Sequence, residues 1–224
     1  MLEQSIGQLA RNIPGATRVF RQHRLDFCCG GSKRLADALA ERGVPAEPVL
    51  EELTRLAERH ESPQSWDQVD NAALVSHIQQ HYHERHREQL PELIRLATRV
   101  EQVHGERPEC PVGLARLLQE IRQELESHML KEEQVLFPLL QLPGLAPLRM
   151  PIAIMREEHD QHGESLAALE RLTHDITPPR GACNTWRALY SGLEQFREDL
   201  MMHIHLENNV LFPRAEIGQR GERQ

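Results

Sequence analysis

Aromatic residues, cysteines and long apolar runs are scarce in this chain of 224 residues. Aromatics make up 4% of it, and runs of β-branched or aromatic residues with the two-residue period of a strand are missing, which argues against a β-sheet protein. No apolar run approaches the roughly 18 residues that cross a bilayer. The N-terminal segment shows neither the basic nor the apolar region of a secretory signal. We therefore expect an all-α protein of the cytoplasm, without a membrane partner.

Charge and cysteine content exclude two further classes of protein. The formal net charge of −8 argues against a nucleic-acid partner. Four cysteines, two of them adjacent, do not indicate a disulfide framework. Histidine is the residue in excess, because 13 histidines accompany only 2 tryptophans and 2 tyrosines. This excess does not fit an average globular domain.

Turn residues divide the chain into two predicted helical regions. Residues 1–60 contain short segments separated by glycine and proline, which fit a small domain of three or four short helices. The polar, proline-containing stretch 60–65 is the predicted linker. Residues 68–215 contain four long helical patterns with short connections, which predict an antiparallel up-and-down four-helix bundle. These patterns cover residues 68–104, 110–140, 148–175 and 182–212.

The bundle region contains an internal repeat. Residues 128–138 read HMLKEEQVLFP and residues 203–213 read HIHLENNVLFP, so the pattern His-x3-Glu-x2-Val-Leu-Phe-Pro recurs at an offset of 75. Residues 83–90 read HERHREQL and residues 159–166 read HDQHGESL, at an offset of 76. The first two helices are thus repeated as the last two. We expect the repeated polar residues to meet near an approximate twofold axis.

Polar residues of the repeat fall on apolar helix faces. On the second helix, the apolar spacing that includes Leu125 continues to His128 and Glu132, and then to Val135 and Leu139. Burying a carboxylate and an imidazole without partners costs several kcal/mol each. A shared metal ion would remove that cost.

The other three helices place polar residues in the same way. His203 and Glu207 continue the apolar face of the fourth helix, and His83 and His159 lie in register with the apolar faces of the first and third. Spacing i, i+4 puts a histidine and a glutamate on one helix face, and all four histidines are expected on one layer of the bundle. The predicted metal ligands are His83, His128, Glu132, His159, His203 and Glu207.

The donor set indicates the metal. Four imidazoles and two hard carboxylates suit two iron ions, each held by two histidines and bridged by both glutamates. An oxo or hydroxo bridge would add a fifth ligand to each ion and leave one position open. Thiolate ligands would suit zinc better, and no cysteine lies on this layer.

Other polar residues near the layer receive separate predictions. Glu124 and Asp199 also repeat, and are either acceptors that orient the imidazoles or solvated acidic residues. His86 and His162 repeat one turn beyond the ligands and are expected to flank them. His104 lies 21 residues after His83, about 30 Å along a helix, and is excluded from the site. The remaining histidines are expected at the surface or at helix ends, namely His23, His60, His77, His81, His174 and His205.

With these motifs in place, the chain resembles a known family. The six predicted ligands on four helices resemble a hemerythrin-like domain, although oxygen carriers of that type use a His-x3-His pair and a terminal Asp where this chain has a second His-x3-Glu. The N-terminal sequence Asp26-Phe27-Cys28-Cys29-Gly30-Gly31 resembles the signature of the small ScdA-like domain that precedes it in iron–sulfur cluster repair proteins. The combination is identified as the RIC family, of the YtfE or ScdA type.

The resemblance implies a function and partners. It implies a non-haem di-iron protein that repairs iron–sulfur clusters damaged by nitrosative or oxidative stress, as an iron donor to damaged or apo iron–sulfur proteins. Reduction of nitric oxide or of peroxide at the di-iron site is the alternative, and an oxygen or redox sensor is disfavoured because no signalling module is recognisable. The sequence does not decide between donation and catalysis, nor does it fix the oligomeric state, a homodimer included.

The adjacent cysteines receive two interpretations. Cys28 and Cys29 precede two glycines, and thiolates there would be soft enough to hold iron transiently. An ordinary buried pair that packs the small domain is the alternative. If the pair transfers iron, we expect its turn to lie against the di-iron layer or to move toward it. Cys110 and Cys183 are assigned no role.

Overall fold

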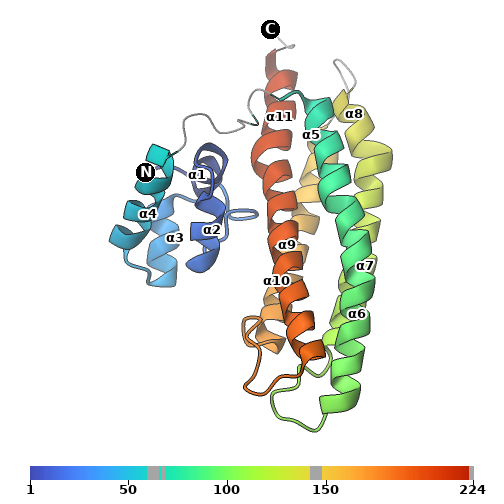
Figure 1. The fold of residues 1–224 in the computed structure, drawn as a ribbon. Coiled ribbons are helices and arrows are strands. Elements are labelled where there is room, and N and C mark those ends of the chain that lie inside the picture. The colour runs from blue at the N-terminus through green and yellow to red at the C-terminus, as the bar shows by residue number, and fades with distance from the viewer. Residues whose placement is uncertain (60–65, 67–68, 142–147, 222–224) are drawn as a thin grey trace. The chain divides into compact units, whose positions relative to one another are not determined.

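A computed structural model describes residues 1–59, 66, 69–141 and 148–221. The predicted linker at 60–65 and the predicted break at 143–147 lie outside the described residues. Over the described ranges the chain is helical and contains no strand (Figure 1), so the predicted all-α class and the helical bundle are confirmed. The chain divides into two compact units, one formed mainly by Met1–Leu74 and Met201–Gln224, the other by Val75–Leu142 and Ala146–Leu200.

Four short helices form the N-terminal part of the first unit. They are α1 (Ile6–Asn12), α2 (Ala16–Gln22), α3 (Leu35–Arg42) and α4 (Ala46–Arg59). A capping box begins α1, because the Ser5 side chain accepts from the backbone N–H of Gln8 and the Gln8 side chain accepts from that of Ser5. Buried aliphatic residues and two phenylalanines, Phe20 and Phe27, fill the centre of this small domain.

The C-terminal end of the chain belongs to the same unit. It contains the end of α10 (Asn184–Leu206), the π-helical turn η4 (Glu207–Leu211) and α11 (Phe212–Gly221). Helix α1 packs against η4, and Met201 and Met202 pack against the core of the small domain. The N-terminal helices therefore pack against the end of α10 and the turn that follows it.

The second unit is built from long helices. Helix α6 packs against α7, and α7 packs against α9. The segments of this region are α5 (Asn71–Ile78), η2 (Gln79–His83), α6 (Glu84–His104), α7 (Leu114–Lys131), η3 (Glu132–Leu136), α8 (Phe137–Gln141), α9 (Arg149–Leu172) and most of α10. The apolar face predicted for the fourth helix is buried from Trp186 to Leu200, so its helical spacing is confirmed.

One predicted register is wrong. Val135 and Leu139 were expected to continue the buried face of the second helix, but Val135 is 52% exposed, whereas Leu136 and Leu140 are buried. The cause is the π-helical turn η3, which takes one more residue per hydrogen-bonded turn than an α-helix. The extra residue moves the buried positions one place along the chain.

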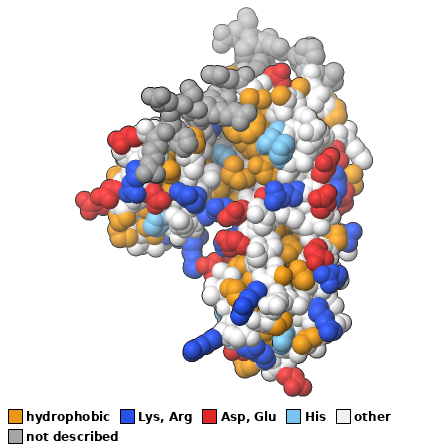
Figure 2. All heavy atoms as spheres, viewed as in Figure 1, with side chains coloured by type: hydrophobic (Ala, Val, Ile, Leu, Met, Phe, Trp, Pro, Cys, Tyr) orange, Lys and Arg blue, Asp and Glu red, His pale blue; other side chains and the backbone are white. Residues whose placement is uncertain are grey.

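The surface is mixed in charge. On the face shown in Figure 2, acidic and basic side chains alternate without a broad area of one sign. Among the described helices, none is both long and apolar enough to cross a membrane.

Candidate metal centre

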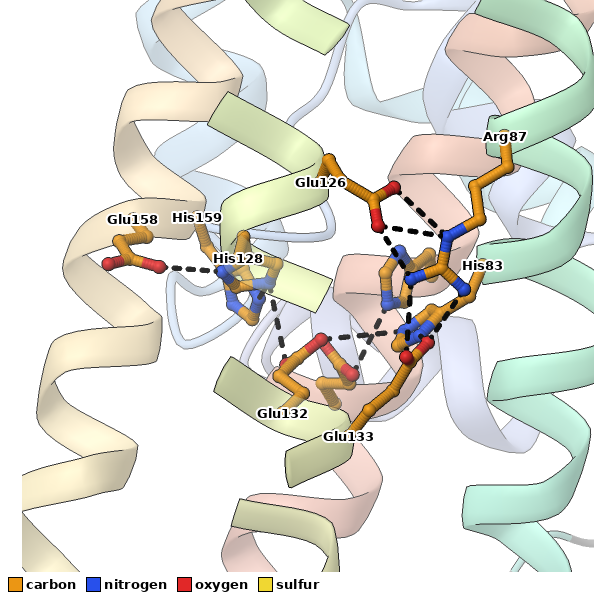
Figure 3. A network of polar contacts seen from close by, with 10 residues as sticks. His83, Arg87, Glu126, His128, Glu132, Glu133, Glu158 and His159 are labelled. Carbon is orange, nitrogen blue, oxygen red and sulfur yellow. Dashed lines mark hydrogen bonds and ion pairs between the residues drawn. The ribbon is translucent and has the colours of Figure 1, made fainter. Parts of the chain in front are cut away.

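Two imidazoles face opposite oxygens of one buried carboxylate. Glu132 Oε2 lies 3.4 Å from His83 Nε2, and Glu132 Oε1 lies 3.4 Å from His128 Nε2. These separations exceed an ordinary N–H···O hydrogen bond. Two ligands that are each about 2 Å from one ion lie about 3 Å apart. Glu132 therefore has the geometry of a carboxylate that offers one oxygen to each of two ions (Figure 3).

The remaining predicted ligands form close pairs of their own. His159 Nε2 lies 3.1 Å from His128 Nε2, so two ring nitrogens of the same kind point at one place, as two ligands of a shared cation do. On the last long helix, His203 Nε2 lies 3.2 Å from Glu207 Oε1 in the i, i+4 arrangement.

All six predicted ligands fall into two overlapping groups. Within each group the candidate ligand atoms lie within 4.8 Å of one another. One group is His83, Glu132, His203 and Glu207, and the other is His128, Glu132, His159 and Glu207. Glu132 and Glu207 belong to both, which is the arrangement that two bridging carboxylates require.

The burial of these polar side chains points to a shared partner. All six side chains are at most 1% exposed, although isolated buried carboxylates and imidazoles are strongly disfavoured. Nitrogen and carboxylate oxygen donors in one buried layer suit a transition metal such as iron. The residues therefore fit the metal centre that their spacing predicts.

Three π-helical turns adjoin the ligands. His83 is the last residue of η2, whereas Glu132 and Glu207 are the first residues of η3 and η4. Single π-helical turns inside α-helices are frequent at functional sites. The wider turn rotates the residues that follow relative to those before, so a helix can present its ligand inward and still bury the apolar residues beyond it.

Carboxylates hold the outer nitrogens of two imidazoles. His83 Nδ1 lies 2.8 Å from Glu133 Oε1, and His128 Nδ1 lies 2.9 Å from Glu158 Oε2. With Nδ1 donating to a carboxylate, each Nε2 keeps a lone pair for a metal. The hydrogen bond with His128 is the main reason that the pKa of Glu158 is lowered to about 2.

Sequence reasoning missed both of these acceptors. Each stands next to a predicted ligand in the chain, Glu133 after Glu132 and Glu158 before His159, which is the signal that could have found them. The internal repeat hid them, because the positions that correspond to Glu133 and Glu158 hold Asn208 and Tyr82.

The acidic residues that were predicted to orient the imidazoles do not lie against them among the described contacts. Glu124 is exposed, and Asp199 accepts from Gln89 Nε2 at 2.7 Å and pairs with Arg85; neither has a described contact with an imidazole. His86 is fully buried against the ring of Phe196.

Three further histidines can be compared with their predicted positions. His162 is buried, with its ring edge-on to that of His128. His104 contacts Cys183 and the ring of Trp186, near the beginning of α10, and belongs to neither ligand group. His205 was expected at the surface or at a helix end, but it is 2% exposed, and burial lowers its pKa to about 4.

The adjacent cysteines lie in a tight turn organised by Asp26. Asp26 Oδ1 accepts from the backbone N–H groups of Cys28 and Cys29, and Oδ2 accepts from that of Gly30. The two Sγ atoms are 3.8 Å apart, and Asp26, Cys28 and Cys29 form a third group of candidate ligand atoms. The hydrogen bond with Cys29, followed by burial, raises the pKa of Cys28 well above its usual range, so Cys28 is a thiol near neutral pH.

The CCGG turn, residues Cys28 to Gly31, is held by the segment that follows Glu207. Asn209 Nδ2 donates to the carbonyl oxygens of Phe27 at 3.2 Å and of Cys28 at 3.3 Å. Asn208 Nδ2 also donates to the carbonyl oxygen of Cys28, at 3.3 Å. His205 Nδ1 lies 3.4 Å from the carbonyl oxygen of Phe27.

Two glycines make room for the asparagine. A Cβ atom on Gly7 or on Gly31 would lie 2.3 Å from Asn209 Oδ1, closer than any side chain tolerates. The close approach therefore requires glycine at both positions. The CCGG turn is thus bonded to the two residues that follow Glu207.

Comparison with known families assigns the class. The model of the "Hemerythrin HHE cation binding domain" matches residues 74–215, and the model of the ScdA_N domain, "Domain of Unknown function (DUF542)", matches residues 2–57. The chain belongs to the hemerythrin HHE cation-binding family, as its motifs predict.

Named relatives share both parts. The "Iron-sulfur cluster repair protein YtfE" of Yersinia pseudotuberculosis serotype IB (strain PB1/+) is 50% identical over 216 residues, which cover 96% of this chain and 98% of the relative. The protein of the same name from Yersinia pestis (strain Pestoides F) matches to the same extent. The predicted resemblance to iron–sulfur cluster repair proteins is confirmed.

Proposed function

We propose that this chain is a non-haem di-iron protein that repairs iron–sulfur clusters damaged by nitrosative or oxidative stress, acting in the cytoplasm as an iron donor. The two overlapping groups of buried ligands carry the proposal, and the names of the relatives support the repair role. Its partners would be damaged or apo iron–sulfur proteins. We divide the chain into a small ScdA-like domain, residues 1–60, and a di-iron bundle, residues 68–215.

The proposed ligands would hold two iron ions. One ion would be held by His83 and His203 and the other by His128 and His159, with Glu132 and Glu207 shared between them. Two histidines and two carboxylate oxygens would occupy four positions of each ion, and iron accepts further ligands. The iron would be the labile metal that is transferred, and the buried donors of the protein would hold it until the transfer.

The cysteine pair is the proposed acceptor on the transfer path. Two thiols and the Asp26 carboxylate lie within 4.8 Å of one another, and their turn is bonded to the residues after Glu207. Because a thiol must lose its proton to bind a metal, loading Cys28 releases a proton. The raised pKa of Cys28 weakens such binding near neutral pH, which suits an intermediate holder better than a storage site.

A catalytic role is the second candidate. Each proposed ion has four protein donors, so positions remain for a small ligand such as nitric oxide or peroxide. In that case the iron would stay bound while the ligand is reduced.

Two assays of the iron-loaded protein separate the candidates. In the first, the protein is mixed with an apo iron–sulfur protein, sulfide and reductant; in the second, with nitric oxide and reductant but no client. Donation predicts that the client regains its cluster absorbance while the iron content of this protein falls. Production of nitrous oxide over several turnovers, without loss of iron, would instead support catalysis.

A cysteine variant tests the transfer path. Cys28→Ser with Cys29→Ser is expected to keep both irons and to slow transfer to the client. The matched control is Cys110→Ser with Cys183→Ser, which changes two cysteines outside the CCGG turn. Equal transfer rates for the two double variants at equal iron loading would reduce the pair to a packing feature.

A further inference from the structure

A chain of polar contacts links each of two proposed ligands to a cation near the surface. The first chain runs from His83 through Glu133 to Arg87 (Figure 3), because Glu133 Oε1 is 2.8 Å from His83 Nδ1 and 2.9 Å from Arg87 Nη1. The second runs from His128 through Glu158 to Lys131, whose Nζ donates to Glu158 Oε1. In both, one carboxylate is shared between a buried imidazole and a cation.

Arg87 is fixed and yet reaches solvent. Its guanidinium forms hydrogen bonds to both oxygens of Glu133 and of Glu126. The side chain is 33% exposed and lines a groove of about 910 Å³ between α6 and α7. Lys131 lines the same groove with its side chain 48% exposed. Both cations can therefore be replaced without opening the apolar core.

The chemistry of a shared carboxylate gives these cations a role. A carboxylate that accepts from an imidazole Nδ1–H makes the ring more electron-rich and its Nε2 a stronger metal ligand. A cation on the same carboxylate competes for its negative charge, so the imidazole is polarised less. The cation thus weakens the ligand through the carboxylate without touching it.

We propose that Arg87 and Lys131 are positioning residues that keep His83 and His128 at moderate donor strength and so keep the bound iron exchangeable. This inference rests on the proposed metal centre but not on repair.

The test replaces each charge and measures the iron directly. In Arg87→Gln and Lys131→Gln, the carboxylate acts on the imidazole alone, which favours the oxidised ion. We expect the iron of each variant to have a lower midpoint potential, and Fe(II) to pass to an excess of chelator about threefold more slowly. Arg87→Lys keeps the positive charge and is expected to restore most of the potential.

Two further variants make the result decisive. Arg122→Gln removes an exposed charge from the same groove outside both contact chains, and should change neither quantity. Glu133→Gln keeps an acceptor oxygen but removes the negative charge that polarises His83, and should speed iron loss by about 10-fold or more.

Arg87→Gln can then give three results. Slower release and a lower potential support the proposal. Faster release, as expected for Glu133→Gln, would show that the arginine only orients Glu133 and would overturn it, as would values equal to those of Arg122→Gln. No client protein is present, so failure of repair and failure of this inference are separate results.

Discussion

The side-chain nitrogen of Asn209 lies 3.2 Å from the carbonyl oxygen of Phe27, although the two residues are 182 positions apart in the chain. This contact joins the second residue after a proposed iron ligand to the residue before the cysteine pair. It holds the N-terminal cysteines beside the helical segment that contains Glu207.

Removing this asparagine should release the CCGG turn. In Asn209→Ala, the bonds to Phe27 and Cys28 are lost, and we expect a loss of about 1–2 kcal/mol of local stability. Hydrogen exchange of the backbone amides of residues 27–31 should therefore accelerate about 5- to 30-fold. Amides of α9 provide the internal control and should not change. Unaltered exchange in the turn would show that other contacts hold it.

Replacing either bridging glutamate should cost more than one iron per chain. In Glu132→Ala, both proposed ions lose a ligand, and the same holds for Glu207→Ala. Iron content after loading under identical conditions is the measurement. Glu124→Ala, on α7 before η3, is the matched control, because Glu124 is exposed and outside the ligand groups. A full complement of two irons in either variant would rule out the bridging assignment.

His104→Ala should leave the iron content unchanged. Its ring contacts Trp186, which lies 17 residues before His203 on α10, about 25 Å along a helix. The expected effect is a small loss of stability from the missing ring contact. His83→Ala, analysed alongside, should lose iron. Iron loss in the His104 variant would contradict the expected distance between His104 and the proposed iron ligands.

Alkylation should show that Cys28 is a poor nucleophile near neutral pH. Only the thiolate reacts, and the pKa of Cys28 is raised by its hydrogen bond with Cys29 and by burial. Raising the pH therefore increases its reaction rate until the pH passes that raised value. Mass spectrometry that resolves Cys28 from exposed Cys183 provides the rates. A plateau in the Cys28 rate below pH 8 would contradict the shift.

The fold could be predicted from sequence because its signals are local and repeated. Apolar residues at helical spacing run through the fourth long helix without interruption from Trp186 to Leu200, and the polar residues that follow them recur in both halves. The side chains of the six proposed ligands could be grouped for the same reason: a carboxylate or imidazole on a buried helix face needs a partner.

Other features depend on contacts that no spacing encodes. The π-helical turn after Lys131 shifted the buried positions, because an α-helical period does not anticipate an extra residue. His205 is buried with its ring against that of Phe27, 178 residues earlier in the chain. Glu133 and Glu158 act across helices, on imidazoles 50 and 30 residues away.

The two halves of the repeat differ at one position that matters for the site. One copy keeps Glu133, which supports an imidazole. The other has Asn208 at that position, and its amide instead holds the cysteine turn. The two equivalent positions thus carry different tasks, because the carboxylate contacts a proposed metal ligand and the amide contacts the cysteine turn. This difference gives the repeated helix pairs a polarity, because the cysteine turn is bonded at only one of the two equivalent positions in the described chain.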